Sequence, residues 1–136
     1  MVEIDIEYLG DLRCKAVHGP SKMELLTDAP VDNQGKGEAF SPTDLCATAL
    51  GTCMTTIMGI QARTLGIDIA GTKVNVKKTM SADQPRRISQ LDVDISIPGE
   101  WSDKIKGQLK RAAEHCPVHY SLHPDIVVNL NLIWES

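Results

Sequence analysis

Aromatic side chains are scarce in this sequence, and their scarcity limits what the protein can bind. Phe, Tyr and Trp together make up 4% of the 136 residues. Single-stranded nucleic acids stack their bases on such rings, and the formal net charge of −4 leaves no excess of basic residues to contact phosphates. We therefore expect no nucleic-acid partner and no anionic membrane surface as a partner. The core must be built from aliphatic side chains and methionine.

Targeting and cysteine-pair signals are also missing. The opening stretch MVEIDIEYLGD has no basic region followed by an apolar run, which predicts no signal peptide. No apolar stretch approaches the ~20 residues of a membrane span, so we predict a cytoplasmic location, where structural disulfides are rare. Without a C-x-x-C motif, the cysteines are expected to be free core thiols, metal ligands or redox groups: Cys14, Cys46, Cys53 and Cys116.

Periodicity along the chain predicts one α+β domain that covers residues 1–136. Three short strands, 2–10, 12–18 and 22–28, should form an antiparallel meander, and a loop rich in Gly, Pro and Asp follows. The remaining predicted elements are a helix over 42–66, a hairpin of strands over 67–80 and 87–99, helices over 103–116 and 117–122, and a strand over 126–134. The order is βββ-α-ββ-α-(short α)-β.

The predicted helix over 42–66 has the clearest start and end signals. Ser41 suits the N-cap, Pro42 the first helical position, and Asp44 completes a capping-box-like start, while Gly66 suits the C-terminal stop. Nothing between Asp44 and Arg63 is charged, and many of the residues are small. We expect a long buried helix that forms the spine of the domain or of a dimer.

Two cysteines lie on helices that must pack on one core. Cys116 ends the apolar stripe of the helix over 103–116, and Pro117 follows it and can open a new helix. The free N–H groups of that new helix should then point toward the Cys116 sulfur and favour its thiolate. With Cys53 on the long helix, this is the arrangement of a redox pair. The alternative is that both thiols are small core hydrophobes.

Other interpretations of these residues stay open at this point. Cys116, His115 and His119 are close in sequence, and Cys53 could complete a metal site, although no tight pair of ligands occurs elsewhere in the chain. His119 could instead cap the short helix, lie on the surface or tune the thiols. The other two cysteines, at positions 14 and 46, are expected to serve packing alone.

The segment SPTDLCATALGTCMTTIMGIQARTLGI, followed much later by AAEHCPV, resembles the OsmC/Ohr family of thiol peroxidases. The resemblance covers essentially the whole chain and includes the order of elements. It implies that Cys53 is the peroxidatic cysteine and Cys116 the resolving one. It further implies an intertwined homodimer with long buried central helices, and the reduction of hydroperoxides, organic ones above all, by the protein's own thiols without another cofactor. The implied partners are a small-molecule peroxide and a thiol reductant, lipoyl or another dithiol.

The same resemblance implies a cation from the amino-terminal sheet that activates Cys53, and Arg13 in YLGDLRCK is the nearest match. In the family an acidic residue directly follows the proline at the helix start and orients this arginine. Thr43 occupies that place here, and the nearest acid is Asp44, which is either the partner of the arginine or a helix cap. The alternative function is a non-catalytic dimer of the same fold that binds a small hydrophobic ligand or a metal.

Overall fold

The computed structural model describes residues 1–135, which fall into two compact units, Met1–Cys46 and Ala47–Ser136. Each unit is described by itself. That all 136 residues form a single domain stays a prediction.

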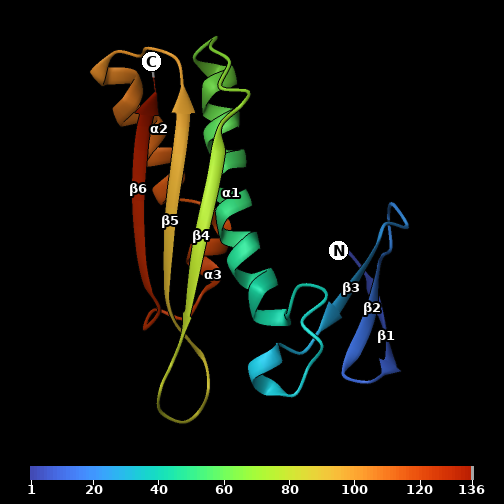
Figure 1. Cartoon of the computed structure of the whole chain (residues 1–136). Helices are drawn as coiled ribbons and strands as arrows, with labels where there is room; N and C mark the ends of the chain where they lie inside the picture. Colours follow the sequence, from blue (N-terminus) through green and yellow to red (C-terminus); the bar gives the residue numbers. More distant parts are fainter. Residues whose placement is uncertain (136) are drawn as a thin grey trace. The chain divides into compact units, whose positions relative to one another are not determined.

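The first unit is built on a three-stranded antiparallel sheet. Strands β1 (Ile4–Gly10), β2 (Arg13–His18) and β3 (Glu24–Asp28) pair in the order β1-β2-β3, which confirms the predicted meander (Figure 1). The tight turn from β1 to β2 places Asp11 and Leu12 at positive φ. A short 3₁₀ helix, Val31–Asn33, lies inside the predicted loop.

One face of this small sheet is apolar and open. The alternation in β1 points Ile4, Ile6 and Tyr8 to the same side, and the strand register adds Leu25 of β3 to it. These four side chains, here called the meander face, are 59%, 68%, 63% and 44% exposed. A contiguous apolar surface of this kind commonly marks a surface that a partner covers.

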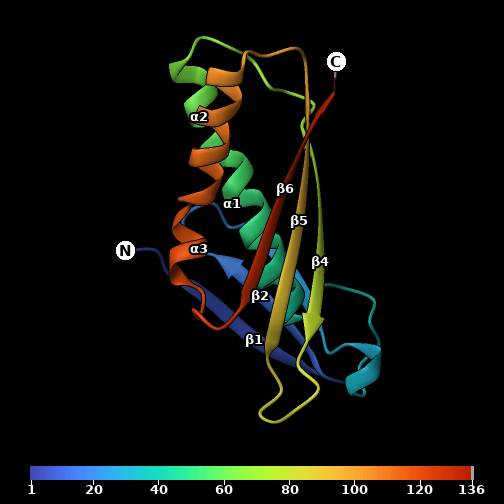
Figure 2. The same ribbon diagram turned by 90° about the vertical axis from the view of Figure 1, so that its left-hand side faces the viewer.

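The second unit is a three-stranded sheet with helices on one face. Strands β4 (Lys73–Met80), β5 (Ile88–Pro98) and β6 (Val127–Glu135) lie in the order β4-β5-β6. The predicted hairpin of β4 and β5 is antiparallel, whereas β6 pairs with β5 in parallel. Figures 1 and 2 show the helices α1 (Pro42–Thr64), α2 (Asp103–Glu114) and α3 (Pro117–Ser121) on the same side of this sheet.

The core of the second unit lies between the sheet and these helices. The central strand β5 alternates strictly, so one set of its side chains is fully buried while the other set forms a polar outer face. The helix α1 adds a stripe of buried residues at helical spacing. The fully buried side chains with 0% exposure are Leu50, Met54, Met58, Leu91, Val93, Ile95, Ile97, Leu109, Ala113 and Cys116.

The helix boundaries follow the predicted signals closely. The backbone N–H of Asp44 donates to Ser41 Oγ at 3.1 Å, and the N–H of Ser41 donates to Asp44 Oδ2 at 2.9 Å, which is a complete capping box at the start of α1. Gly66 has φ +72° just after the end of α1. At the start of α2, Ser102 Oγ accepts from the N–H of Ile105 at 3.2 Å.

Within one chain, the predicted burial of α1 is only partial. Only 33% of its most apolar 18-residue window is buried, because the sheet covers one side of the helix and leaves the other open. Over residues 1–135, α1 is the one helix long and apolar enough to cross a membrane by length and composition, which the sequence analysis did not anticipate. A core helix passes the same test, so this is weak evidence for a membrane span.

At Gly51, α1 lies close to side chains of β4. A Cβ added there would lie 2.7 Å from Val76 Cγ2 and 3.3 Å from Val74 Cγ1.

We expect Gly51→Ala to destabilise the fold by about 1–3 kcal/mol, because the methyl group forces the helix away from the strand. Gly59→Ala is the matched control, since its Cβ meets nothing within 4 Å. That change should stabilise by about 0.5–1 kcal/mol through helix propensity. Urea denaturation of both variants distinguishes packing from propensity, and equal shifts would contradict the close approach.

Candidate functional site

The two cysteines of the predicted redox pair meet in the core of the second unit. Cys53 lies in the middle of α1 and is partly buried, whereas Cys116 is 0% exposed. Cys53 packs against the core cluster that contains Cys116, and it acts on the pKa of the Cys116 thiol, although the two residues are far apart in sequence. Both are free thiols in this structure. Two neighbouring thiols in one core can form a disulfide when one of them is oxidised.

The chain geometry around Cys116 explains how its sulfur is held in place. Cys116 is the N-cap of α3, and Pro117 occupies the first position of that helix, as the sequence predicts. The backbone N–H of His119 donates to Cys116 Sγ at 3.4 Å. The thiol therefore takes the place that a Ser or Asp side chain occupies in most helix starts. His119 contacts the thiol through its backbone, so its influence on Cys116 does not depend on the imidazole.

The pKa of the Cys116 thiol is higher than the sequence predicts. Burial raises the pKa of the Cys116 thiol most strongly, the N–H of His119 opposes this, and the hydrogen bond and charge of Cys53 raise the pKa further. The helix start does favour the Cys116 thiolate, as predicted, but desolvation of the charged form outweighs the donated hydrogen bonds, so the pKa of Cys116 is raised overall. A thiol with a raised pKa keeps its proton more readily than an exposed cysteine does.

Arg13 lies in the first unit and has well-defined acidic partners. Its Nε and Nη2 donate to Asp28 Oδ1 and Oδ2 at 2.7 and 2.9 Å, a bidentate pair across β2 and β3. Glu38 adds a contact at 3.7 Å to Nη2, and its backbone N–H donates to Asp28 at 3.1 Å. The Asp28 side chain is 1% exposed, so the guanidinium is anchored from the inside of the unit.

Asp28 and Glu38 are the residues that sequence reasoning missed. The resemblance directed attention to Asp44 as the orienting acid, but Asp44 is engaged in the capping box described above. One signal was available: in a meander, Asp28 at the end of the third strand falls opposite Arg13 at the start of the second. Because buried carboxylates are rare without a partner, this register alone would have suggested the pair.

The Arg13–Asp28 pair should make stability depend on acid. The hydrogen bond and charge of Arg13 lower the pKa of Asp28 against the opposing effect of burial. A folded-state pKa below the unfolded value of about 3.9 stabilises the protein above that pH, and this stabilisation is lost as the pH falls through the folded pKa. We expect Asp28→Asn to be less stable than the unmodified protein at pH 7 but to lose less stability below about pH 4. Urea denaturation between pH 7 and 2 measures this, with Asp5→Asn on exposed β1 as the control. Parallel curves for the unmodified protein and Asp28→Asn would contradict the linkage.

The remaining candidates are spread over the structure. Cys46 is exposed on α1, and Cys14 is partly exposed on β2. No group of three or more His, Cys, Asp or Glu side chains that could hold a metal ion is found in residues 1–135.

One protein family and several solved structures are similar to this chain. The family described as OsmC-like protein matches residues 35–131. No match was found among curated proteins. A solved structure from Psychrobacter arcticus 273-4 is 50% identical with a TM-score of 0.90, and the alignment covers 98% of this chain and 96% of that one. That protein carries a provisional assignment as an osmotic stress induced and detoxification response protein.

More distant solved structures share the fold. An organic hydroperoxide resistance protein OsmC from Legionella pneumophila has a TM-score of 0.75 at 15% identity, with 100% of this chain and 97% of that one covered. The organic hydroperoxide resistance protein OhrB of Bacillus subtilis has a TM-score of 0.70 at 14% identity, with 97% of each chain covered. At these identities the similarity shows the common α+β fold.

Proposed function

This chain belongs to the OsmC-like family, and from that premise we propose that it is a cysteine-based peroxidase that reduces organic hydroperoxides and, less well, hydrogen peroxide. The observation that carries the proposal is that Cys53 packs against the core cluster that contains Cys116 and acts on the pKa of its thiol. The family includes organic hydroperoxide resistance proteins, which supports the same chemistry. A role in the oxidative stress response and a cytoplasmic location belong to this proposal.

The proposed reaction proceeds in three balanced steps. The Cys53 thiolate attacks the terminal oxygen of the hydroperoxide, so that the O–O bond breaks, the alcohol leaves with a proton, and Cys53 becomes a sulfenic acid. The Cys116 sulfur then forms the S–S bond with Cys53, and the sulfenic oxygen leaves as water with the Cys116 proton. An external dithiol, lipoyl or another, reduces the disulfide by exchange and is itself oxidised.

The different environments of the two thiols support this division of roles. Cys53 is partly exposed and can meet a peroxide, whereas Cys116 is completely buried and keeps its proton. A buried neutral thiol is protected from direct oxidation. Cys116 would therefore react only with the oxidised neighbour it already contacts.

We also propose that Arg13 supplies the positive charge that stabilises the Cys53 thiolate and the leaving oxygen. Its bidentate pair with Asp28 fixes the guanidinium plane and keeps it charged. In this proposal Asp28 takes the orienting role that the family gives to the acid after the proline. Asp44 stays the less favoured candidate, because its carboxylate caps α1.

A homodimer is part of the proposal because two apolar surfaces lack a cover in one chain. The meander face is open, and α1 exposes apolar and small residues on the side away from its sheet. Together these surfaces are suited to association with a second copy of the chain. Burial by that copy would make α1 the central helix that the sequence predicts.

A charge on the meander face should therefore break the dimer. We expect the unmodified protein to elute with the mass of two chains, and Ile6→Lys to elute as one chain or to lose stability as the protein is diluted, because a lysine cannot be desolvated there at low cost. Glu7→Lys is the matched control on the opposite face of the same strand. Size-exclusion chromatography with light scattering decides this, and a monomeric unmodified protein at micromolar concentration would overturn the dimer.

The peroxidase proposal is tested by counting thiols. One equivalent of cumene hydroperoxide added to the reduced protein should remove two of the four thiols and lower the intact mass by two hydrogens, as an intramolecular disulfide requires. Peptide mapping should place the bond between Cys53 and Cys116. Thiols that survive excess hydroperoxide unchanged would overturn the enzymatic function while leaving the fold assignment untouched.

A further inference from the structure

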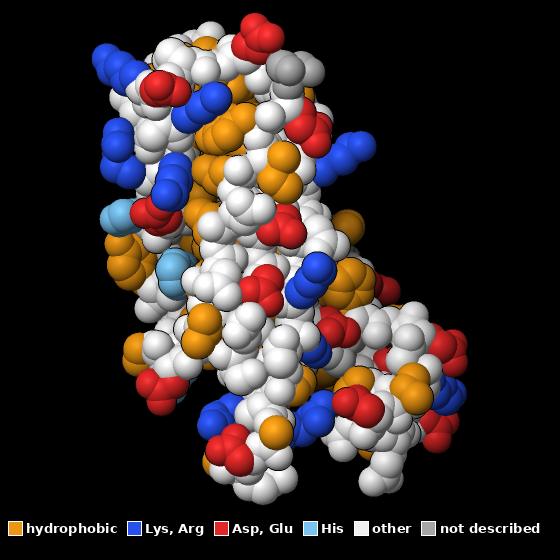
Figure 3. Space-filling view, turned by 60° about the vertical axis from the view of Figure 1, so that its left-hand side comes forward, with side chains coloured by type: hydrophobic (Ala, Val, Ile, Leu, Met, Phe, Trp, Pro, Cys, Tyr) orange, Lys and Arg blue, Asp and Glu red, His pale blue; other side chains and the backbone are white. Residues whose placement is uncertain are grey.

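A cavity lies in the second unit, lined by residues of α2 and β6. It has a volume of about 320 Å³, which is within the range of small-molecule sites. The helix contributes Lys106, Gly107 and Lys110, and the strand contributes Leu130, Asn131, Leu132 and Trp134. Figure 3 shows this region as a hollow with hydrophobic side chains along its floor and basic side chains on the α2 side.

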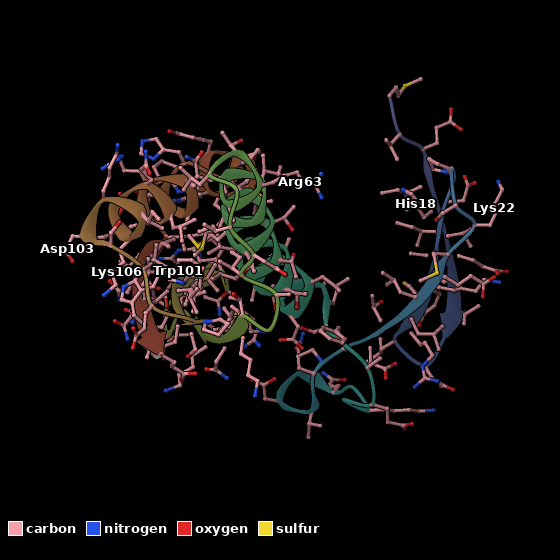
Figure 4. All side chains as sticks on the ribbon, turned by 90° about the horizontal axis from the view of Figure 1, so that it is seen from above. His18, Lys22, Arg63, Trp101, Asp103 and Lys106 are labelled. Atoms are coloured by element: carbon pink, nitrogen blue, oxygen red, sulfur yellow. The ribbon has the colours of Figure 1, made fainter. Side chains whose placement is uncertain are left out.

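The charged side chains that line this cavity are both basic. Lys106 and Lys110 are its charged lining residues, and no carboxylate lines it. Lys106 Nζ lies 5.6 Å from the centre of the Trp134 ring, and within residues 1–135 it forms no ion pair. Lys110 is 61% exposed and is 3.8 Å from Glu114 Oε1, a weak contact that leaves it free to turn. Figure 4 shows Lys106 beside the ribbons of α2 and β6.

The floor of the cavity is apolar and incompletely covered. Leu130, Leu132 and Trp134 alternate along β6 and point to the helix side, where all three are only partly buried. β6 is an edge strand, so no further strand closes the cavity on that side in the described chain. An alkyl chain laid on these three side chains would remove apolar surface from water, which favours binding by about 25 cal/mol per Å².

We propose that this cavity binds amphipathic anions, a carboxylate on a medium-length alkyl chain in particular. The carboxylate lies between the ammonium groups of Lys106 and Lys110, where it accepts charge-assisted hydrogen bonds. The alkyl chain lies over Leu132 and Leu130, and the Trp134 ring packs against its carboxyl end. A cavity with cations on one rim and an apolar floor matches both parts of such a molecule.

This site is distinct from the thiol pair. Lys106 and Lys110 lie on α2, whereas Cys116 lies beyond the end of that helix, at the N-cap of α3. None of the lining residues contributes to the contact between Cys53 and Cys116. Ligand binding here therefore does not depend on the peroxidase proposal, and either can fail alone.

Trp134 is a built-in reporter for the test. The chain has two tryptophans, so Trp101→Phe leaves Trp134 as the single indole. Titration of this variant with sodium decanoate, below the concentration at which decanoate forms micelles, should change the fluorescence saturably. Calorimetric titration of the unmodified protein gives the same answer if the variant does not fold. The affinity should fall as ionic strength rises, because the head group is held by exposed charges.

Matched variants and ligands make the result specific. Lys106→Gln should weaken decanoate binding roughly tenfold, the loss of one charge-assisted contact. Lys104→Gln, on the same helix but outside the cavity, should leave it unchanged. Decanol, which lacks the charge, should bind at least about tenfold more weakly than decanoate. Absence of saturable binding by both methods overturns the proposal, as does equal binding of decanol or an equal loss in Lys104→Gln.

Discussion

Cys53→Ser is expected to reduce the turnover of cumene hydroperoxide by at least about three orders of magnitude, to the level of free thiols in solution. The serine hydroxyl cannot form a sulfenic acid, and no other cysteine has the same environment. Cys46 is exposed on the same helix but has no described thiol partner, and Cys14 lies in the first unit. The measurement is peroxide consumption with dihydrolipoamide as the reductant.

Cys116→Ser should have a different effect from Cys53→Ser. The first step needs only Cys53, so one equivalent of hydroperoxide should still be consumed quickly, and the sulfenic acid should then persist long enough to be trapped by dimedone. Steady-state turnover should fall, because no neighbouring thiol completes the disulfide. Cys46→Ser serves as the control for both variants and should retain full activity.

Two outcomes would contradict this assignment of roles. If Cys53→Ser kept its activity, the nucleophile would have to be another thiol. If Cys116→Ser formed the trapped sulfenic acid no more readily than the unmodified protein, Cys116 would not be the resolving residue. Circular dichroism of each variant shows whether the loss is chemical or follows from unfolding.

The fold could be predicted well because its local signals agree with one another. The capping box at Ser41, the glycine stop at Gly66 and the strict alternation in residues 88–98 each fix an element, and the structure confirms all three. The parallel pairing of β6 with β5 could not be predicted in this way. Strand direction depends on where the two intervening helices return the chain, and that is a tertiary property.

The candidate site shows the limit of reasoning from local sequence. The proline after Cys116 correctly predicted a new helix start, yet the pKa of the thiol moves the opposite way from the expectation. The cap contributes two hydrogen bonds that favour the thiolate, but burial by elements distant in sequence opposes them. Desolvation depends on the whole core, so no local motif could have revealed which effect is larger.

The partner of Arg13 was missed for a related reason. Asp44 lies where a family pattern directs attention, whereas Asp28 is identified only by strand register. The partly exposed α1 is a similar case. Its apolar composition predicts burial, but it does not say whether the same chain or another one covers the helix. In both cases the sequence shows which side chains need a partner, but the three-dimensional arrangement decides which partner they have.

The largest loss of stability is expected from a substitution in the buried stripe of α1, which holds Cys53 against the core. Leu50 lies one turn before Cys53, is 0% exposed and belongs to the continuous core of the second unit. Leu50→Ala should lower the free energy of unfolding by about 2–5 kcal/mol, because it removes apolar contacts and leaves a cavity that the sheet cannot close.

Lys104→Ala on α2 is the control for Leu50→Ala, because it truncates an exposed side chain outside the two surfaces assigned to the dimer. This change should alter stability by no more than about 0.5 kcal/mol. Urea denaturation at one fixed protein concentration measures both variants, since a dimer makes stability depend on concentration. Because the stripe positions the thiol, Leu50→Ala should also let Cys116 react faster with a bulky alkylating reagent in the folded protein. A loss below about 1 kcal/mol with unchanged alkylation would show that α1 is held by contacts other than this stripe.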